Sequence, residues 1–192
     1  MTAPNKVADI GIIVLAAGSG NRFGSDKRQA TLPDNRTLLS ASLDRIPGSF
    51  TRKILVLRQD DVELAKQFQD HWQICRAPHP ETGMANSLVS GIKMAENWEA
   101  ALIALGDMPF IAPTTFNTLQ QALQTKPLVV PTCRGQRGNP VGFSKQFFTE
   151  MTALEGDRGA RALLKKYAAQ CCEIETGDEG ILRDVDYPDA LK

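Results

Sequence analysis

The sequence predicts an α/β fold whose mainly parallel sheet is covered by helices on both faces. Short, continuous apolar runs recur along the chain, and amphipathic stretches with helical spacing separate them. This alternation is typical of parallel sheets that are buried on both sides. A length of 192 residues suits one α/β domain, and no repeat or linker interrupts it, so we expect a single domain over residues 1–192.

The predicted strands are the apolar runs. Four of them are typical of fully buried strands: residues 10–14, 54–57, 101–105 and 128–130. A fifth segment, residues 172–175, alternates between polar and apolar side chains as an edge strand does. In folds of this class, ligands bind beyond the carboxyl ends of the strands, so we expect the functional site there.

The predicted helices lie between these strands. Asp60 and Glu63 are candidate caps of one helix, and Pro113 suits the first turn of a later one. A short terminal helix is expected over residues 186–191. The apolar faces of the four main helices are predicted to be Val62, Ala65 and Phe68; Met84, Leu88, Ile92 and Ala95; Phe116, Leu119 and Leu123; and Ala160, Leu163, Leu164 and Tyr167.

Charge and composition limit the classes of partner. The chain has 22 Lys and Arg and 22 Asp and Glu residues, so its formal net charge is zero. This balance argues against broad nucleic-acid or membrane-surface binding. The chain start lacks the apolar core of a signal peptide, no run approaches the length of a membrane span, and the four cysteines show no metal-ligand spacing. A cytoplasmic enzyme is the simplest class that fits.

Residues 15–27, LAAGSGNRFGSDK, carry the most functional information and are called the glycine-rich loop below. They follow the first predicted strand, and their three glycines allow backbone N–H groups to approach an anion closely. Arg22 and Lys27 supply cations that neutralise such an anion. The segment therefore predicts a loop at a strand end that wraps a polyphosphate.

Two common nucleotide-binding motifs fit this loop poorly. A dinucleotide fingerprint needs G-x-G-x-x-G, whereas the third glycine here comes one residue late, and Asp44 lies in a predicted helix rather than at the end of a second strand. A P-loop needs lysine directly after glycine, but two residues separate Gly24 from Lys27. An ordinary flexible turn between a strand and a helix is the alternative interpretation.

The second informative position is Asp107, which directly follows the most apolar run in the sequence LGDMP. Its carboxylate is expected at the same sheet edge as the glycine-rich loop. Mg²⁺ prefers oxygen ligands and often takes one or two protein carboxylates, with phosphate and water as the rest. On its own the motif fits a structural turn equally well. Together with the glycine-rich loop, it favours a metal–nucleotide site.

Two further loops are candidates to complete the pocket. Asn86 and Ser87 lie in residues 81–87, which lead into a helix whose free N–H groups suit a base or a phosphate; a well-capped core helix is the alternative. Residues 134–142, RGQRGNPVG, carry two arginines and are placed to hold an anionic substrate or to bring Asn139 near the metal. The alternative for this segment is a solvent-exposed hairpin.

The C-terminal region adds three carboxylates of interest. Asp157 suits the N-cap of the helix that follows it, which is its simpler interpretation. Asp184 and Asp186 are each placed either to give the metal a second carboxylate or to cap the terminal helix. The sequence does not rank these two roles.

These motifs together resemble the molybdenum cofactor nucleotidylyltransferases, which have a MobA-like NTP transferase domain, and especially their cytidylyltransferase branch. LAAGSGNRFGSDK resembles the nucleotide loop of that family and GDMPF its metal loop, and both are shared widely among nucleotidyltransferases. GMANSLVSGI, GNPVGF, GDRGARALL and DVDYPDAL, in this order, extend the resemblance over nearly the whole chain. The guanylyltransferase branch usually has LAGG where this chain has LAAG, so Ala17 favours CTP.

The resemblance implies a three-layer α/β/α Rossmann-like nucleotidyltransferase fold that binds a nucleoside triphosphate and Mg²⁺. The implied reaction is cytidylyl transfer from CTP to the phosphate of a molybdopterin-type cofactor, with pyrophosphate released and a molybdoenzyme as recipient. A nucleotidyltransferase for another small phosphorylated acceptor, or a non-catalytic protein that delivers cofactor, is the alternative. The implied site consists of Lys27, Arg22 and Asp107 as catalytic residues, Asp107 as metal ligand, Leu15, Ala16, Ala17, Gly18, Ser19, Gly20, Asn86 and Ser87 at the nucleotide, and Asn139 and Asp186 at the acceptor or a second metal position.

Three positions depart from the family pattern. Asn139 stands where relatives often have histidine before Pro-Val, and Tyr187 replaces threonine in the terminal motif. Arg28 follows Lys27, where an apolar stretch is usual. These departures bear on the acceptor more than on the chemistry.

Overall fold

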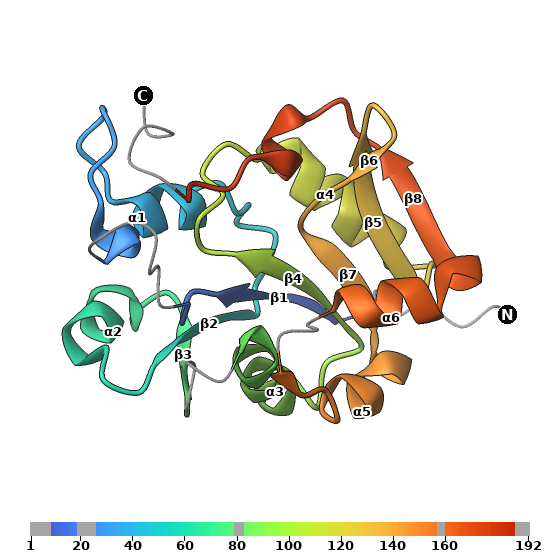
Figure 1. Ribbon diagram of the computed structural model, residues 1–192, viewed down its shortest axis with the longest axis horizontal. Helices are drawn as coiled ribbons and strands as arrows, with labels where there is room; N and C mark the ends of the chain where they lie inside the picture. Colours follow the sequence, from blue (N-terminus) through green and yellow to red (C-terminus); the bar gives the residue numbers. More distant parts are fainter. Residues whose placement is uncertain (1–8, 19–25, 79–82, 157–159, 187–192) are drawn as a thin grey trace, which may run out of the picture.

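A single sheet forms the centre of the computed structural model, which describes residues 9–18, 26–78, 83–156 and 160–186 (Figure 1). Its eight strands are β1 (Ile10–Leu15), β2 (Lys53–Arg58), β3 (Gln73–Ala77), β4 (Ala100–Leu105), β5 (Leu128–Cys133), β6 (Gln136–Arg137), β7 (Val141–Ser144) and β8 (Cys171–Glu175). Their order in the sheet is β3-β2-β1-β4-β7-β5-β6, and β8 pairs with β5. The contacts of β6 and β7 are antiparallel and the others parallel, so the predicted mainly parallel α/β sheet is confirmed.

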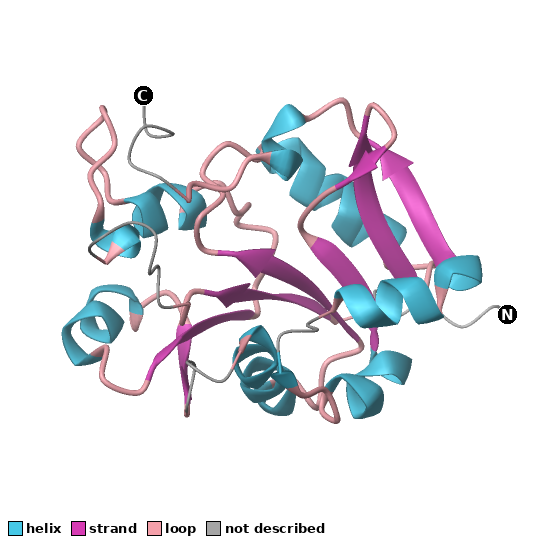
Figure 2. Cartoon of the chain, viewed as in Figure 1, coloured by secondary structure: helices cyan, strands magenta, loops and turns pink. Residues whose placement is uncertain are grey.

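Helices cover both faces of this sheet, which gives the three layers (Figure 2). They are α1 (Leu38–Leu43), α2 (Val62–Phe68), α3 (Met84–Met94), α4 (Pro113–Ala122), α5 (Phe148–Met151) and α6 (Arg161–Lys166), with short 3₁₀ helices at Lys27–Gln29 (η1), Lys145–Phe147 (η3), Ala168–Gln170 (η5) and Glu179–Leu182 (η6). None of the helices in the described ranges is both long and apolar enough to cross a membrane.

The core consists of two hydrophobic clusters separated by the sheet. Along β1, Ile12 and Val14 point to one face and Ile13 and Leu15 to the other, as the period of two in a strand requires. The first face is covered by α1, α2 and α4, and the second by α3, α5 and α6. Because both faces are buried, the strand sequences are apolar throughout rather than alternating.

The carboxyl ends of the first four strands meet at one edge of the sheet. Leu15 at the end of β1 pairs with Val56 in β2 and with Leu105 at the end of β4, and β3 runs parallel to β2. The glycine-rich loop and Asp107 therefore leave the sheet side by side, as the sequence predicts.

Several local predictions are wrong. Val62 and Met84 are 47% and 50% exposed, because each is the first residue of its helix and lies ahead of the turns that pack on the sheet. The N-cap of α2 is Asp61 rather than Asp60, and its side chain makes no capping bond. The predicted terminal helix does not include Asp186, and its remaining residues, like Asp157, lie outside the described ranges.

Three strands were not predicted. β3 contains Gln73 and Arg76, which are partly or fully exposed, so it lacks the continuous apolar run of its neighbours. β6 and β7 lie in and after RGQRGNPVG, where the chain turns back at Gly135, whose φ is 75°. The hairpin alternative for this segment therefore describes its backbone correctly.

Candidate active site

The start of the glycine-rich loop lies directly against the loop that follows β4. The backbone N–H of Gly106 donates to the carbonyl of Leu15 at 3.0 Å. A Cβ atom at position 106 would lie 2.9 Å from the Cβ of Ala16, so the close approach of the two loops requires glycine there. This approach places Asp107 beside the loop.

Lys27 lies between two aspartates from distant parts of the chain. Its Nζ is 2.6 Å from Oδ2 of Asp107 and 3.0 Å from Oδ1 of Asp186, and it also donates to the carbonyl of Val185 at 3.3 Å. The backbone N–H of Val185 in turn donates to the carbonyl of Asp107 at 3.0 Å. The end of β4, the start of η1 and the C-terminal region therefore converge on one ammonium group.

Burial sets the electrostatics of this group. The side chains of Lys27 and Asp107 are only 14% and 20% exposed. Burial acts to lower the pKa of Lys27, but the charges and hydrogen bonds of Asp107 and Asp186 outweigh it and raise that pKa. Burial raises the pKa of Asp107 above its usual range, although the Lys27 ammonium opposes the shift.

The second carboxylate oxygen of Asp107 has a distinct environment. Within the described part of the chain, Oδ1 is buried and has no hydrogen-bond partner. An unpaired buried charge-bearing oxygen is costly, and hard cations such as Mg²⁺ prefer oxygen ligands of this kind. The donor set around Lys27 consists of carboxylate and carbonyl oxygens, so these residues fit a divalent metal that shares the site with Lys27.

Residues 176–186, called the C-terminal segment below, bring Asp186 to this edge of the sheet. Asp178 fixes the segment to α4, because its Oδ2 accepts the N–H of Ala112 at 2.8 Å and the hydroxyl of Thr115 at 2.6 Å. Further along, the carbonyl of Ile181 accepts the N–H of Asn139 at 3.0 Å.

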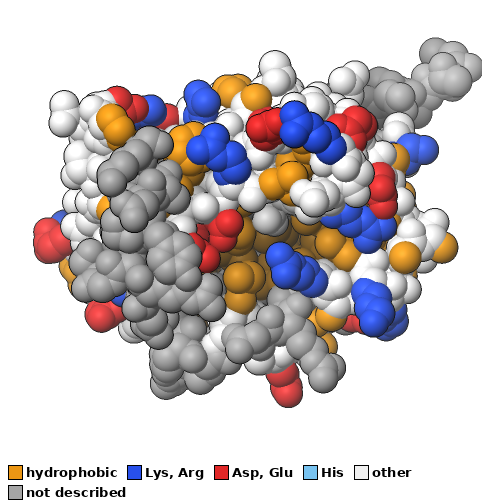
Figure 3. All heavy atoms as spheres, turned by 45° about the horizontal axis from the view of Figure 1, so that its top comes forward, with side chains coloured by type: hydrophobic (Ala, Val, Ile, Leu, Met, Phe, Trp, Pro, Cys, Tyr) orange, Lys and Arg blue, Asp and Glu red, His pale blue; other side chains and the backbone are white. Residues whose placement is uncertain are grey.

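When the upper side of Figure 1 is turned forward, the surface shows a hollow with hydrophobic side chains on its floor and charged side chains around it (Figure 3).

The other predicted site residues have varied surroundings. Asn86 and Ser87 lie in the first turn of α3, which packs on β1, β2 and β3; Ser87 is buried and Asn86 half-buried. Asn139 is half-buried beside the C-terminal segment. The two arginines of the hairpin are exposed and form ion pairs, Arg134 with Glu179 and Arg137 with Glu173. Ser19, Gly20 and Arg22 lie outside the described residues.

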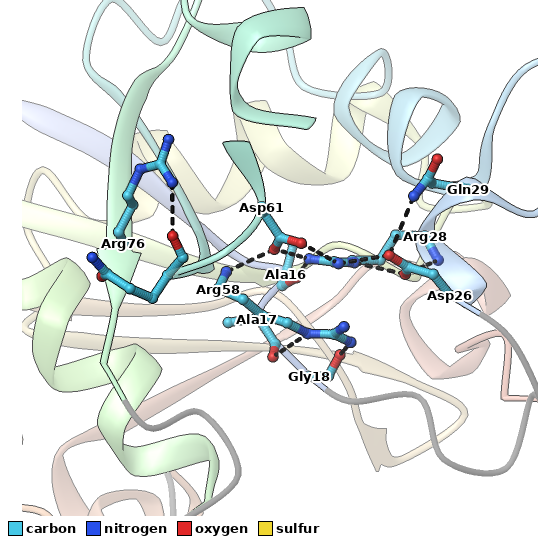
Figure 4. A network of polar contacts seen from close by, with 10 residues as sticks. Ala16, Ala17, Gly18, Asp26, Arg28, Gln29, Arg58, Asp61 and Arg76 are labelled. Carbon is cyan, nitrogen blue, oxygen red and sulfur yellow. Dashed lines mark hydrogen bonds and ion pairs between the residues drawn. The ribbon is translucent and has the colours of Figure 1, made fainter. Parts of the chain in front are cut away.

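Sequence reasoning missed a second group of charged residues at the same edge. The buried Arg28 forms ion pairs with the half-buried Asp26 and Asp61, and Arg58 lies next to this cluster (Figure 4). Both arginines donate to carbonyls in the glycine-rich loop. The signal in the sequence was the unusual Arg28 after Lys27.

A mainly parallel sheet with a glycine-rich loop after its first strand, and with a lysine and carboxylates at its edge, is typical of a nucleotidyltransferase. The chain belongs to the family described as the MobA-like NTP transferase domain, whose family model matches residues 12–171.

Individual relatives agree with this assignment. The purine catabolism protein PucB of Bacillus subtilis (strain 168) is 30% identical over an alignment of 195 residues. The alignment covers 92% of this chain and 91% of PucB. The crystal structure of Rv0371c from Mycobacterium tuberculosis H37Rv superposes with a TM-score of 0.82 at 27% identity and covers 95% of both chains. A structure of Rv0371c in complex with manganese gives a TM-score of 0.73 at 24% identity over 88% of both chains, which shows the shared fold.

Proposed function

We propose that the protein transfers a cytidylyl group from CTP to the phosphate of a molybdopterin-type cofactor and releases pyrophosphate. The observation that carries the proposal is the bridge from Lys27 to Asp107 and Asp186, beside a buried oxygen of Asp107 that lacks a hydrogen-bond partner in the described structure. A cation and two carboxylates at one sheet edge supply what a metal-bound triphosphate needs.

Asp107 and Asp186 are the residues proposed to hold the metal. Their oxygens suit Mg²⁺ or Mn²⁺ better than softer metals. Rv0371c, which shares the fold, has been solved as a complex with manganese. A bound Mg²⁺ would supply positive charge to the triphosphate, and Asp186 would be the second metal ligand that the sequence left open.

The proposed reaction is a single in-line displacement. An oxygen of the acceptor phosphate attacks the α-phosphorus of CTP, a new P–O bond forms, and the bond to the β-phosphate breaks as pyrophosphate leaves. The attacking oxygen is already anionic, so no strong general base is needed. Lys27, and Arg22 by the family resemblance, act by neutralising charge on the phosphates and by positioning them.

Residues 15–18 and the first turn of α3 are proposed to lie against the nucleotide. Ala17 is buried at the start of the glycine-rich loop, in the hydrophobic cluster that α3 covers. We propose that it favours CTP over GTP. Asn139, which is fixed to the C-terminal segment, is proposed to lie on the acceptor side, and a molybdoenzyme of the cytoplasm is the proposed recipient.

A panel of substrates tests this function. CTP and GTP are each incubated with Mg²⁺ and with molybdopterin, a sugar phosphate or an alcohol phosphate, and pyrophosphate release is measured. The proposal expects release with CTP and molybdopterin above all other pairs. Preference for GTP would refute the base assignment, and preference for another phosphate would establish the alternative acceptor class. Tight cofactor binding without any Mg²⁺-dependent turnover would support the delivery protein instead.

A further inference from the structure

Arg28 is a buried cation directly after the proposed catalytic lysine. Its side chain is only 4% exposed. Arg28 Nε and Nη2 donate to the two oxygens of Asp26 at 2.8 and 2.6 Å, and Nη2 also donates to Oδ1 of Asp61 at 2.7 Å. Nη1 donates to Oδ2 of Asp61 and to the carbonyl of Ala16, the latter at 2.9 Å. All five N–H donors of the guanidinium are thus in use, so Arg28 has none to offer a phosphate.

The partners of Arg28 lie on both sides of residues 19–25. Ala16 precedes that part of the glycine-rich loop, and Asp26 follows it and caps the 3₁₀ helix that Lys27 begins. Asp61 belongs to the turn between β2 and α2, where its Oδ2 also accepts the backbone N–H of Arg58 at 2.8 Å. One guanidinium therefore connects the two ends of the loop to each other and to the turn between β2 and α2 (Figure 4).

Arg58 adds a second connection at the first end. Its Nε donates to the carbonyl of Ala17 at 3.3 Å, and its Nη2 donates to the carbonyl of Gly18. The carbonyls of three successive residues, 16 to 18, are thus held by arginines. Arginine suits this task because its planar fork makes several directed bonds at once, which a lysine ammonium does not.

The charges of the cluster keep it intact near neutral pH. Burial acts to lower the pKa of Arg28, but the hydrogen bonds and charges of Asp26 and Asp61 outweigh it and raise that pKa. The hydrogen bonds from Arg28 lower the pKa of Asp26 to about 2, although burial opposes the shift.

We propose that Arg28 is a positioning residue for nucleotidyl transfer, which acts by fixing the backbone from which Lys27 reaches its ligands. The inference rests on the proposed function, because it concerns the same site. Arg28 itself touches no substrate. It holds Ala16 and Asp26 at fixed places, and Lys27 directly follows Asp26.

Arg28→Lys is the test variant, and Arg36→Lys is its matched control. Arg36 forms the same Asp-x-Arg pair with Asp34 and a second pair with Asp44, at 2.6 and 3.0 Å, but it is 43% exposed, and in the described part of the chain these ion pairs do not involve the glycine-rich loop. Two quantities are compared with those of the wild type. The first is amide hydrogen exchange over residues 15–18 and 26–30. The second is kcat and KM for CTP, normalised to the number of CTP-binding sites counted by calorimetry, so that loss of folded protein does not count as loss of rate.

We expect the backbone amide protons of these two segments to exchange faster in Arg28→Lys than in the wild type. The amide protons of the strands outside these segments should stay protected. We also expect kcat and kcat/KM to fall together by about tenfold to a hundredfold, because a displacement of roughly 1 Å costs rates of this order. Arg36→Lys should match the wild type in both. Unchanged exchange, or a normalised kcat like that of the wild type, overturns the proposal. If the wild type turns over no triphosphate, the proposed function fails, and hydrogen exchange alone then decides whether Arg28 fixes the backbone at residues 15–18 and 26–30.

Discussion

The Nζ of Lys27 lies 2.6 Å from Oδ2 of Asp107, which is 80 positions away in the sequence. The two residues meet because β1 and β4 are adjacent parallel strands whose chains leave the sheet at the same edge. Asp186, 159 positions from Lys27, completes the bridge through the C-terminal segment. The fold thus gathers one cation and two carboxylates from three separate motifs.

Lys27→Ala and Asp107→Asn should each abolish pyrophosphate release or reduce kcat by about a hundredfold or more, since each removes charge stabilisation at the transferring phosphate. Both variants should fold, because neither residue belongs to a hydrophobic cluster. Circular dichroism and steady-state kinetics are the measurements. Near-normal turnover in either folded variant contradicts the assigned roles.

A divalent metal should bind at Asp107 in the presence of CTP. Chelation should remove activity, and added Mg²⁺ or Mn²⁺ should restore it. Electron paramagnetic resonance of Mn²⁺ should show a bound fraction in the wild type that is lost in Asp107→Asn, because the carboxylate is replaced by a neutral amide. Equal Mn²⁺ binding by the two proteins would place the metal elsewhere.

The ion cluster around Arg28 should make stability depend on pH in the acid range. The pKa of Asp26 is lowered from 3.8 to about 2 by its hydrogen bonds to Arg28. The carboxylate therefore binds a proton less tightly in the folded state than in the unfolded state. Its contribution is therefore complete above pH 4 and is lost as the pH falls toward about 2. Asp26→Asn should lower the free energy of unfolding at pH 7 by about 1 kcal/mol, a value reduced for solvent screening.

Urea unfolding of Asp26→Asn and wild type between pH 7 and pH 2 measures this difference. The gap between the two proteins should narrow only below about pH 4, where the unfolded-state carboxylate begins to protonate. A constant gap over the whole range would mean that charge does not explain the contribution of Asp26.

Gly180→Ala should displace the C-terminal segment. A Cβ atom at position 180 would lie 2.2 Å from the carbonyl oxygen of Phe110, a clash with backbone that no side-chain movement relieves. We expect a loss of roughly 1–3 kcal/mol in the free energy of unfolding, as for other overpacked sites, together with a lower kcat because Asp186 lies in the same segment. Gly48→Ala is the control, since its Cβ would meet nothing within 4 Å. Equal free energies of unfolding for Gly180→Ala and Gly48→Ala would contradict the close packing of Gly180 on Phe110.

Much of the fold follows from local sequence pattern. β1, β2, β4 and β5 were predictable because both faces of each are buried, which leaves a continuous apolar run. β3 was not, because its polar residues interrupt that pattern. Val62 and Met84 have the right spacing for a buried face, but spacing does not show which end of a helix projects beyond the sheet.

Part of the candidate site was also predictable from the sequence. Lys27 and Asp107 were recognisable from their motifs, and the parallel sheet explains why they meet. The cluster of Arg28 with Asp61 was not, because it joins residues 33 positions apart that belong to no shared motif. Its formation depends on how the turn after β2 packs against the glycine-rich loop, which is a tertiary relationship.

In the proposed reaction, Lys27 and Asp107 support metal-dependent nucleotidyl transfer. The most direct measurement is mass analysis of the nucleotide product, with pyrophosphate counted in parallel, after incubation of CTP and molybdopterin with Mg²⁺. Wild type is compared with Asp107→Asn and with Asp70→Asn, which changes an exposed aspartate in the turn after α2. We expect one cytidylylated acceptor per pyrophosphate in the wild type and in Asp70→Asn, and none in Asp107→Asn. The absence of any nucleotidylated product, or its undiminished formation by Asp107→Asn, would contradict the proposed reaction.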